Sequence, residues 1–188
     1  MKGRESGMPP KNAWEEFFET GAVLEAMGVD ESVENAVDFG CGYGTFSITA
    51  AKKIRGKLYA MDIDQEMISA TQEEADGQRI KNIETIYRDF IAEGTGLKGE
   101  SVDYVMLFNI LHVEDPLSLL KEAYRLLRKS GRVGIIHWNY DPKTPRGPSM
   151  EIRPKPENCV EWAKKAGFSE PRQFDLKPYH YGIVLEKK

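Results

Sequence analysis

The sequence has little cysteine and no long uncharged hydrophobic run. Its 188 residues include two cysteines, Cys41 and Cys159, which are too few for a disulfide framework or a cysteine-based zinc site. We therefore expect both thiols to be reduced. No uncharged stretch approaches the roughly 20 residues of a membrane helix, and the first residues lack the apolar core of a signal peptide. These absences predict a cytoplasmic protein without a membrane segment.

Positive charge is not in excess either. The formal net charge is -4 and the pI is about 5.5, which argues against a surface that is basic throughout and so against nucleic acid as a partner. A local basic patch would not show in such a total, whereas small neutral or cationic ligands fit it. The length is that of one domain, residues 1–188, and is enough to bury a sizeable core.

Short apolar runs rich in β-branched residues alternate along the chain with helical patterns, and there is no internal repeat. The alternation predicts an α/β fold with a doubly wound, mostly parallel sheet and helices on both faces. Five strands are expected at 35–40, 57–63, 83–88, 101–109 and 132–138.

Capping residues mark the expected helix boundaries. Asp64 predicts a helix over 64–75, and Asp115 followed by proline predicts another over 116–129. Gly131 is expected to turn the chain into the fifth strand. After a last helix over 156–167, two strands joined by a short turn predict a hairpin in 171–188.

The stretch "AVDFGCGYGTF", residues 36–46, places Asp38, Gly40, Gly42 and Gly44 between a strand and a helix. Glycines let a ligand approach the backbone, the helix N-terminus favours negative charge, and Asp38 attracts an ammonium group. These features predict a ligand that carries both a positively and a negatively charged group. The glycines alone are also explained by a tight turn. A dinucleotide fingerprint would need Gly or Ala where Thr45 stands, which disfavours a nicotinamide-dependent reductase.

The motif D-x-G-x-G-x-G after the first strand resembles that of class I S-adenosylmethionine-dependent methyltransferases of the type 11-like, small-molecule kind. The resemblance covers residues 33–138 and implies a seven-stranded sheet of order 3-2-1-4-5-7-6 with the last strand antiparallel. It departs at 129–131, where Lys-Ser-Gly replaces the more usual Pro-Gly-Gly. The residues it implies for S-adenosylmethionine are Asp38, Gly40, Cys41, Gly42, Gly44, Asp62, Ile63, Asp89, Phe90 and Asn109.

Several of these residues also have an ordinary structural interpretation. An acid that ends a strand, such as Asp62, is often a helix cap, although Asp64 is the better candidate for that role. Cys41 is more typical of a small filler than of a nucleophile. The joint occurrence of these features at four successive strand ends favours the cofactor interpretation.

The topology predicts that His112, His137 and His180 lie at the edge of the sheet where the cofactor binds. For each histidine taken alone, packing or capping is the favoured explanation, and their joint position at this edge favours a role for His112 and His180. No carboxylate or histidine pair has the helical spacing of metal ligands, so we predict no metal site. If the acceptor needs a base, His112 and then His180 are the candidates.

Three segments are expected to surround the methyl acceptor. A helix within 1–30 carries Trp14 and Phe18 and is expected to act as a lid and partly as core. The Pro-rich loop 139–156 carries Arg146, Arg153 and Lys155, which either contact an anionic acceptor or are solvated. From the C-terminal helix and hairpin, 157–188, the turn is expected to contribute Tyr179 and Tyr181.

The function predicted from these features is methyl transfer from S-adenosylmethionine to a small molecule by in-line displacement. An RNA or protein methyltransferase is less favoured, because "FNILH" stands after the fourth strand instead of the [DN]-P-P-[FYW] turn of exocyclic amino methylation. A non-catalytic module that binds S-adenosylmethionine is the other alternative.

Overall fold

The protein is described by a computed structural model over residues 19–188. The predicted lid residues Trp14 and Phe18 lie outside this part of the chain. Of the expected N-terminal helix, the structure describes α2, Thr20–Ala26. The same residues, 19–188, contain no helix long and apolar enough to cross a membrane.

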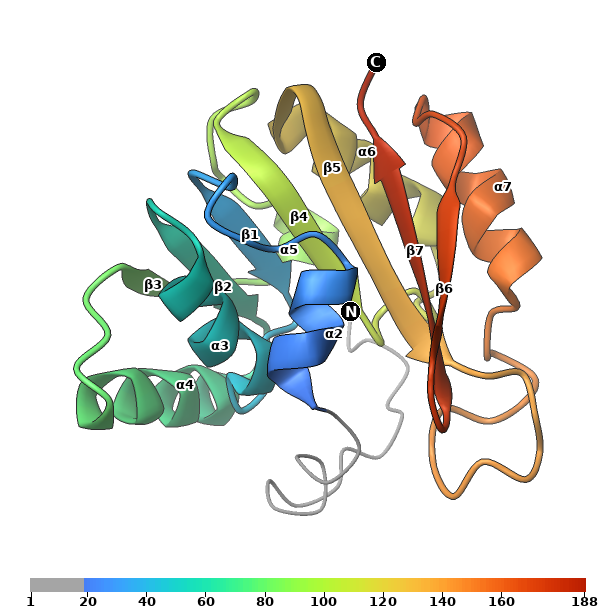
Figure 1. Ribbon diagram of the computed structural model, residues 1–188, viewed down its shortest axis with the longest axis horizontal. Coiled ribbons are helices and arrows are strands. Elements are labelled where there is room, and N and C mark those ends of the chain that lie inside the picture. Colours follow the sequence, from blue (N-terminus) through green and yellow to red (C-terminus); the bar gives the residue numbers. More distant parts are fainter. Residues whose placement is uncertain (1–18) are drawn as a thin grey trace.

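Seven strands form one sheet of order β3-β2-β1-β4-β5-β7-β6 (Figure 1). The first five pair in parallel, and β7 runs antiparallel to both of its neighbours. This confirms the predicted fold class and strand order. The strands are β1 (Ala36–Phe39), β2 (Leu58–Asp62), β3 (Ile83–Tyr87), β4 (Val102–Phe108), β5 (Leu127–Trp138), β6 (Arg172–Leu176) and β7 (His180–Glu186).

Two of the crossover helices begin at the predicted caps. Asp64 accepts a hydrogen bond from the Glu66 backbone N–H at 2.8 Å, and Asp115 accepts one from the Ser118 backbone N–H at 3.0 Å. Each cap satisfies an otherwise unpaired donor of the first turn. The helices are α3 (Thr45–Lys53), α4 (Gln65–Gly77), α5 (Phe90–Glu93), α6 (Pro116–Leu126) and α7 (Pro156–Ala166).

Helices cover both faces of the sheet (Figure 1). Because side chains alternate along a strand, Tyr104 and Met106 of β4 pack with α2, α3 and α4, whereas Val105 and Leu107 pack with α5, α6 and α7. The two buried clusters explain why the central strands are apolar on both faces.

Two predicted boundaries are wrong. Helix α6 ends at Leu126, three residues early, and β5 already starts at Leu127. The cause is a long-range pairing, because the Ser130 N–H donates to the Lys187 carbonyl and the Lys187 N–H donates to the Gly131 carbonyl. Residues 129–131 therefore lie within the strand. Helix α4 also includes Gly77 instead of ending before it.

Candidate active site

The turn between β1 and α3 requires its glycines for backbone reasons. Gly40, Gly42 and Gly44 have φ of 74°, 55° and 79°, in the left-handed region where a Cβ is unfavourable. A Cβ on Gly40 would also lie 2.9 Å from Ile110 Cδ1, and one on Gly44 would lie 3.0 Å from Thr71 Oγ1. The tight turn and close ligand approach are thus compatible explanations of the same residues.

Cys41 lies buried between these glycines. Its Sγ is 3.7 Å from Thr71 Oγ1, and burial raises the pKa of the thiol. A thiol with a raised pKa is protonated at neutral pH, so Cys41 is a small packing residue and not a nucleophile.

Asp38 is a buried carboxylate at the start of the turn. It is 3% exposed, and it accepts a hydrogen bond of 2.6 Å from the Ser47 hydroxyl. Burial, with a smaller contribution from the charge of Asp62, raises the pKa of Asp38 to about 7. A carboxylate in this environment is stabilised by a cation, which is what an ammonium group of a ligand supplies.

Asp62 ends β2 and orients the turn. Its Oδ2 accepts from the Gly42 N–H at 2.9 Å and its Oδ1 from the Asp64 N–H at 3.0 Å. A carboxylate has about four acceptor sites, so each oxygen keeps a lone pair for another donor. Burial raises the pKa of Asp62 as well. Asp64, not Asp62, caps α4, and Asp62 is therefore available to a pair of ligand hydroxyls.

The N-terminus of α3 is open to an anion. Its N-cap residue, Gly44, provides no side-chain cap, and the buried Thr45 hydroxyl has no hydrogen-bond partner among residues 19–188. The unpaired N–H groups and the helix dipole at such an end attract a carboxylate. With Asp38 and Asp62, the turn thus fits a ligand that carries an ammonium, a carboxylate and a diol.

Asp89 and Phe90 follow β3, as the sequence predicts. Asp89 caps the short helix α5 by accepting a hydrogen bond from the Ala92 backbone N–H. This hydrogen bond lowers the pKa of the Asp89 carboxyl. Phe90 is buried and packs edge-on against Phe39, with ring centroids 5.1 Å apart. Ile63 is partly buried against the same cluster.

Asn109 ends β4 in a left-handed conformation, with φ of 55°. Its backbone N–H donates to the Ile136 carbonyl at 2.7 Å. Both polar atoms of its side-chain amide are buried and have no hydrogen-bond partner within 19–188. Buried amides are normally paired, so this side chain marks a place where a ligand group would be bound.

The structure brings two of the three histidines together. The rings of His112 and His137 meet edge to face with centroids 5.6 Å apart. His180 instead lies 4.2 Å from the ring of Trp138, and the neighbouring pairs His137–Tyr181 and Trp138–His180 must project to opposite faces of the sheet. Residues 19–188 contain no cluster of three or more His, Cys, Asp or Glu suited to a metal ion.

Burial sets the protonation of two histidines. It lowers the pKa of His180 to about 3, with the positive charge of Arg153 acting in the same direction. It also holds the pKa of His137 well below its ordinary value. Both rings are therefore neutral at physiological pH, and a ring with a pKa near 3 is a weak base.

The hairpin tyrosines lie beside the end of β5. Tyr179 stacks on Trp138 at 6.4 Å. Tyr181 is buried, and its hydroxyl donates to the Pro154 carbonyl at 3.0 Å and lies 3.4 Å from Cys159 Sγ. Tyr181 thereby attaches the loop 139–156 to the sheet. Burial raises the pKa of Cys159 to about 12, so this thiol stays protonated.

Arg153 organises the loop 139–156, which the sequence did not reveal. It is 8% exposed, and its guanidinium donates to the carbonyl oxygens of Asn139 (3.0 Å), Arg146 (3.2 Å) and Pro148 (2.8 and 3.0 Å). Its donors are thus engaged by the loop itself and not directed at an anionic acceptor. A single arginine in a Pro-rich loop carries no sequence signal of such a role.

Comparisons with known proteins agree with this geometry. Residues 36–131, just over half of the chain, match the family model described as a methyltransferase domain. The chain belongs to this methyltransferase family. The family resemblance inferred from the D-x-G-x-G-x-G motif is thereby confirmed.

The relatives of this chain include two curated enzymes. Demethylmenaquinone methyltransferase of Oceanobacillus iheyensis is 27% identical over 60% of this chain and 48% of its own length. Ubiquinone biosynthesis O-methyltransferase of Actinobacillus pleuropneumoniae is 27% identical over 82% of this chain and 72% of its own. The chain spans 34–48% of the length of the first curated relatives that it matches.

The fold also matches solved structures. A SAM-dependent methyltransferase from Aquifex aeolicus superposes with a TM-score of 0.84, covering 96% of this chain and 94% of its own, at 23% identity. At that identity the similarity establishes the shared fold.

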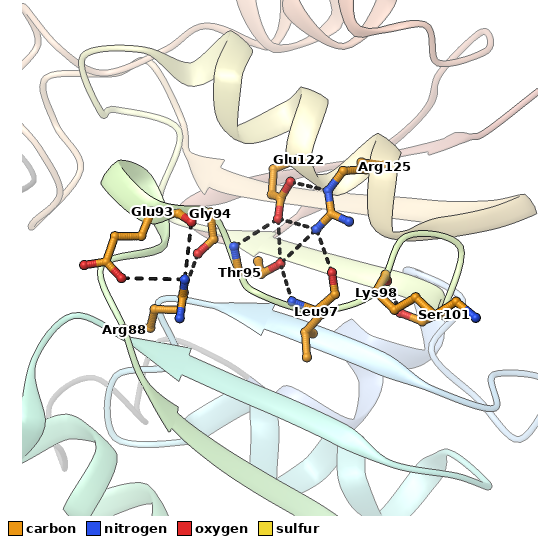
Figure 2. A network of polar contacts seen from close by, with 9 residues as sticks. All are labelled: Arg88, Glu93, Gly94, Thr95, Leu97, Lys98, Ser101, Glu122 and Arg125. Atoms are coloured by element: carbon orange, nitrogen blue, oxygen red, sulfur yellow. Dashed lines mark hydrogen bonds and ion pairs between the residues drawn. The ribbon is translucent and has the colours of Figure 1, made fainter.

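A polar network braces the segment that follows α5 (Figure 2). Glu122 of α6 accepts from the Thr95 backbone N–H at 3.0 Å and from Arg125, whose guanidinium also donates to the Leu97 carbonyl at 2.9 Å. Arg88 donates to the Gly94 carbonyl at 2.6 Å. The network fixes the chain on both sides of Asp89 and Phe90, which are the residues expected at the adenine.

Proposed function

We propose that this protein transfers a methyl group from S-adenosylmethionine to a small-molecule acceptor by in-line displacement. The observation that carries the proposal is the arrangement around the glycine turn. Two buried carboxylates, Asp38 and Asp62, and the uncapped N-terminus of α3 lie at the carboxyl edge of β1 and β2. This arrangement offers one site for each polar group of the cofactor.

Each residue has a distinct binding role in the proposal. Asp38 binds the ammonium group, the α3 N-terminus and the Thr45 hydroxyl bind the carboxylate, and Asp62 binds the two ribose hydroxyls. Asp89 and Phe90 contact the adenine. The cofactor supplies an activated methyl group, so the chain itself has to bind, orient and exclude water.

Positioning accounts for much of the rate enhancement in such a reaction. Well-oriented reactants gain roughly 7–11 kcal/mol relative to free encounter. In the proposal the acceptor lies beside Asn109 and His112, with the hairpin turn and the loop 139–156 on its other side. The stacking of Trp138 on Tyr179 and the Arg153 contacts preform that wall.

Of the two candidate bases, the proposal assigns the role to His112, because His180 is disfavoured. Because burial lowers the pKa of His180 to about 3, its ring accepts a proton poorly at neutral pH. His112 lies beside His137 near the end of β4 and is only 8% exposed. The activities named for the two curated relatives, which concern menaquinone and ubiquinone, support a small-molecule acceptor for this chain.

Calorimetry with S-adenosylmethionine and S-adenosylhomocysteine tests the first half of the proposal. Both ligands are expected to bind with one-to-one stoichiometry. Incubation of the protein and labelled S-adenosylmethionine with metabolite extracts then tests transfer, and label is expected in a small molecule. Absence of binding would refute the proposal, and binding without transfer to any small molecule would favour the non-catalytic or macromolecular alternatives.

A further inference from the structure

His137 is a buried hydrogen-bond donor near the end of β5. Its Nδ1 accepts the backbone N–H of Trp138 at 3.0 Å, which places the ring proton on Nε2. The side chain is fully buried, at 0% exposure. Within residues 19–188 its Nε2 has no hydrogen-bond partner.

Asn109 lies beside His137 in the sheet. Phe108 of β4 pairs with Ile136 of β5, and the Asn109 N–H donates to the Ile136 carbonyl, so Asn109 and His137 are the next residues on adjoining strands. Adjoining strands are about 4.8 Å apart. The amide of Asn109 adds two buried polar atoms that have no partner in the described part of the chain.

Three buried polar atoms without partners on two adjacent residues are uncommon in a native protein. Within the described chain these atoms lie where the strands end, at the edge where the acceptor is proposed to bind. A ligand at this edge is therefore the natural partner of these atoms. An ordered water is the competing occupant.

The donors select the chemistry of that ligand. His137 can only donate here, because Trp138 occupies its other nitrogen, and its buried ring is held neutral. The Asn109 amide can donate beside it. An oxygen with two lone pairs satisfies both donors. The nitrogen of a neutral aromatic amine has one lone pair, which is delocalised into the ring, so it is a poor acceptor for the Nε2–H.

We propose that His137 Nε2–H and the Asn109 amide bind an oxygen of the methyl acceptor, which is therefore an oxygen-bearing compound, represented in the test below by a phenol. This inference rests on the proposed function and names the acceptor class for the same site. His137 is a specificity-determining residue in it, and neither residue acts as the base.

The test uses three matched probes, catechol, 2-aminophenol and 1,2-diaminobenzene, with the full chain loaded with S-adenosylhomocysteine. Calorimetry is expected to give the tightest binding for catechol and the weakest for the diamine. The two should differ at least about tenfold, which corresponds to the cost of leaving a buried donor unpaired. Equal affinities, tighter diamine binding, or no binding of any probe would overturn the proposal.

Variants separate the two donors. His137→Phe removes the N–H and keeps a ring, whereas His137→Gln keeps an N–H donor. Catechol affinity is expected to fall about tenfold or more in the first and to change less than about threefold in the second. Asn109→Asp is isosteric and replaces the donor by a charge, so it should lower the ratio of catechol to diamine affinity.

Asn109 has a left-handed backbone, so a substitution there could act through the backbone alone. Ser130→Gly is the control for such an effect. Ser130 also has a positive φ, 63°, but it lies near the start of β5 instead of its end. Catechol binding should be unchanged in this variant. Folding of every variant is checked by its affinity for S-adenosylhomocysteine and by its melting temperature.

A second readout observes the His137 N–H itself and, like the affinities, does not depend on catalysis. In ¹⁵N-histidine-labelled protein, the Nε2–H resonance of His137, assigned by its loss in His137→Phe, should shift when catechol is added. If S-adenosylhomocysteine binds but neither this resonance nor the affinities respond, an ordered water fills the site and the inference fails alone. If S-adenosylhomocysteine does not bind, the proposed function fails.

Discussion

At the scale of single residues, the two acids after β2 have different functions although they are two positions apart. Asp62 accepts the N–H groups of Gly42 and Asp64 and keeps acceptor capacity for a ligand, whereas Asp64 accepts from Glu66 and caps α4. The sequence suggests this division by helix-capping preferences alone. The hydrogen bond from Gly42 to Asp62 is a contact between two loops, which the sequence does not show.

This division predicts different results for two alanine substitutions. Asp62→Ala should weaken S-adenosylhomocysteine binding by roughly 1.5–3 kcal/mol, the range for hydrogen bonds that involve a charged group. Asp64→Ala should leave the affinity unchanged and lower the stability by about 1 kcal/mol through loss of the cap. Calorimetry and urea unfolding of both variants provide the measurement.

A ligand control shows whether Asp62 touches the ribose. With 2′-deoxy-S-adenosylhomocysteine the additional loss caused by Asp62→Ala should be smaller, because one hydroxyl is already missing. Equal losses for the two ligands would mean that Asp62 acts only by holding the Gly42 backbone.

At the scale of elements, the strand positions and the helix starts follow from local sequence patterns, whereas the sheet order was implied by the resemblance to the methyltransferase family. Strand spacing, the caps and the family motif together predicted seven strands in the observed order. The predicted boundary between α6 and β5 was wrong, because the hydrogen bonds of Ser130 and Gly131 with Lys187 extend the strand toward its N-terminus. Such a contact joins residues more than fifty positions apart, and no local pattern encodes it.

The cofactor half of the candidate site was easier to predict from the sequence than the acceptor half. The acids and glycines of the turn lie at strand ends, where the order of the strands alone places them. The acceptor half depends on side-chain direction and burial. That His137 and His180 project to opposite faces follows only from the register of β5 with β7, and the lid proposed for Trp14 and Phe18 stays a prediction.

The loop 139–156 predicts a specific effect of Arg153. Arg153→Met leaves the carbonyls of Asn139, Arg146 and Pro148 without their charged donor, so the loop should loosen and the protein should lose about 2–3 kcal/mol of stability. Hydrogen exchange across 139–156 should rise, and the KM for the acceptor should increase severalfold with cofactor affinity unchanged.

Arg146→Met is the matched control, because Arg146 lies in the same loop and is exposed. It should change neither exchange nor KM. Arg153→Lys keeps the charge but has no planar fork, so an intermediate result is expected. If Arg153→Met raised KM without increasing exchange, Arg153 would contact the acceptor directly instead of ordering the loop.

For the whole molecule, the buried carboxylate Asp38 links folding, pH and cofactor binding. Burial raises its pKa to about 7, above the value near 3.9 of an exposed aspartate. As pH rises from about 4 to 7, the unfolded chain loses this proton while the folded one retains it. The contribution of Asp38 therefore destabilises the ligand-free protein progressively over that window and levels off above pH 7.

Buried histidines act in the opposite direction. The pKa values of His137 and His180 are lowered, so their contribution to stability is present above the unfolded value near 6.5 and decreases as pH falls below it. The wild-type curve therefore combines two opposing trends. The difference between wild type and Asp38→Asn isolates the acid, because the histidines are common to both.

Through this linkage, cofactor binding should depend on pH at Asp38. Without ligand, Asp38→Asn should gain stability relative to wild type as pH rises from 5 to 8, measured by urea unfolding at fixed salt. With S-adenosylhomocysteine, whose ammonium pairs with ionised Asp38, the ligand-induced rise in melting temperature of the wild type should increase over the same range. In Asp38→Asn that rise should be smaller and nearly independent of pH. A wild-type ligand effect that does not change between pH 5 and 8 would show that the cation binds elsewhere than at Asp38.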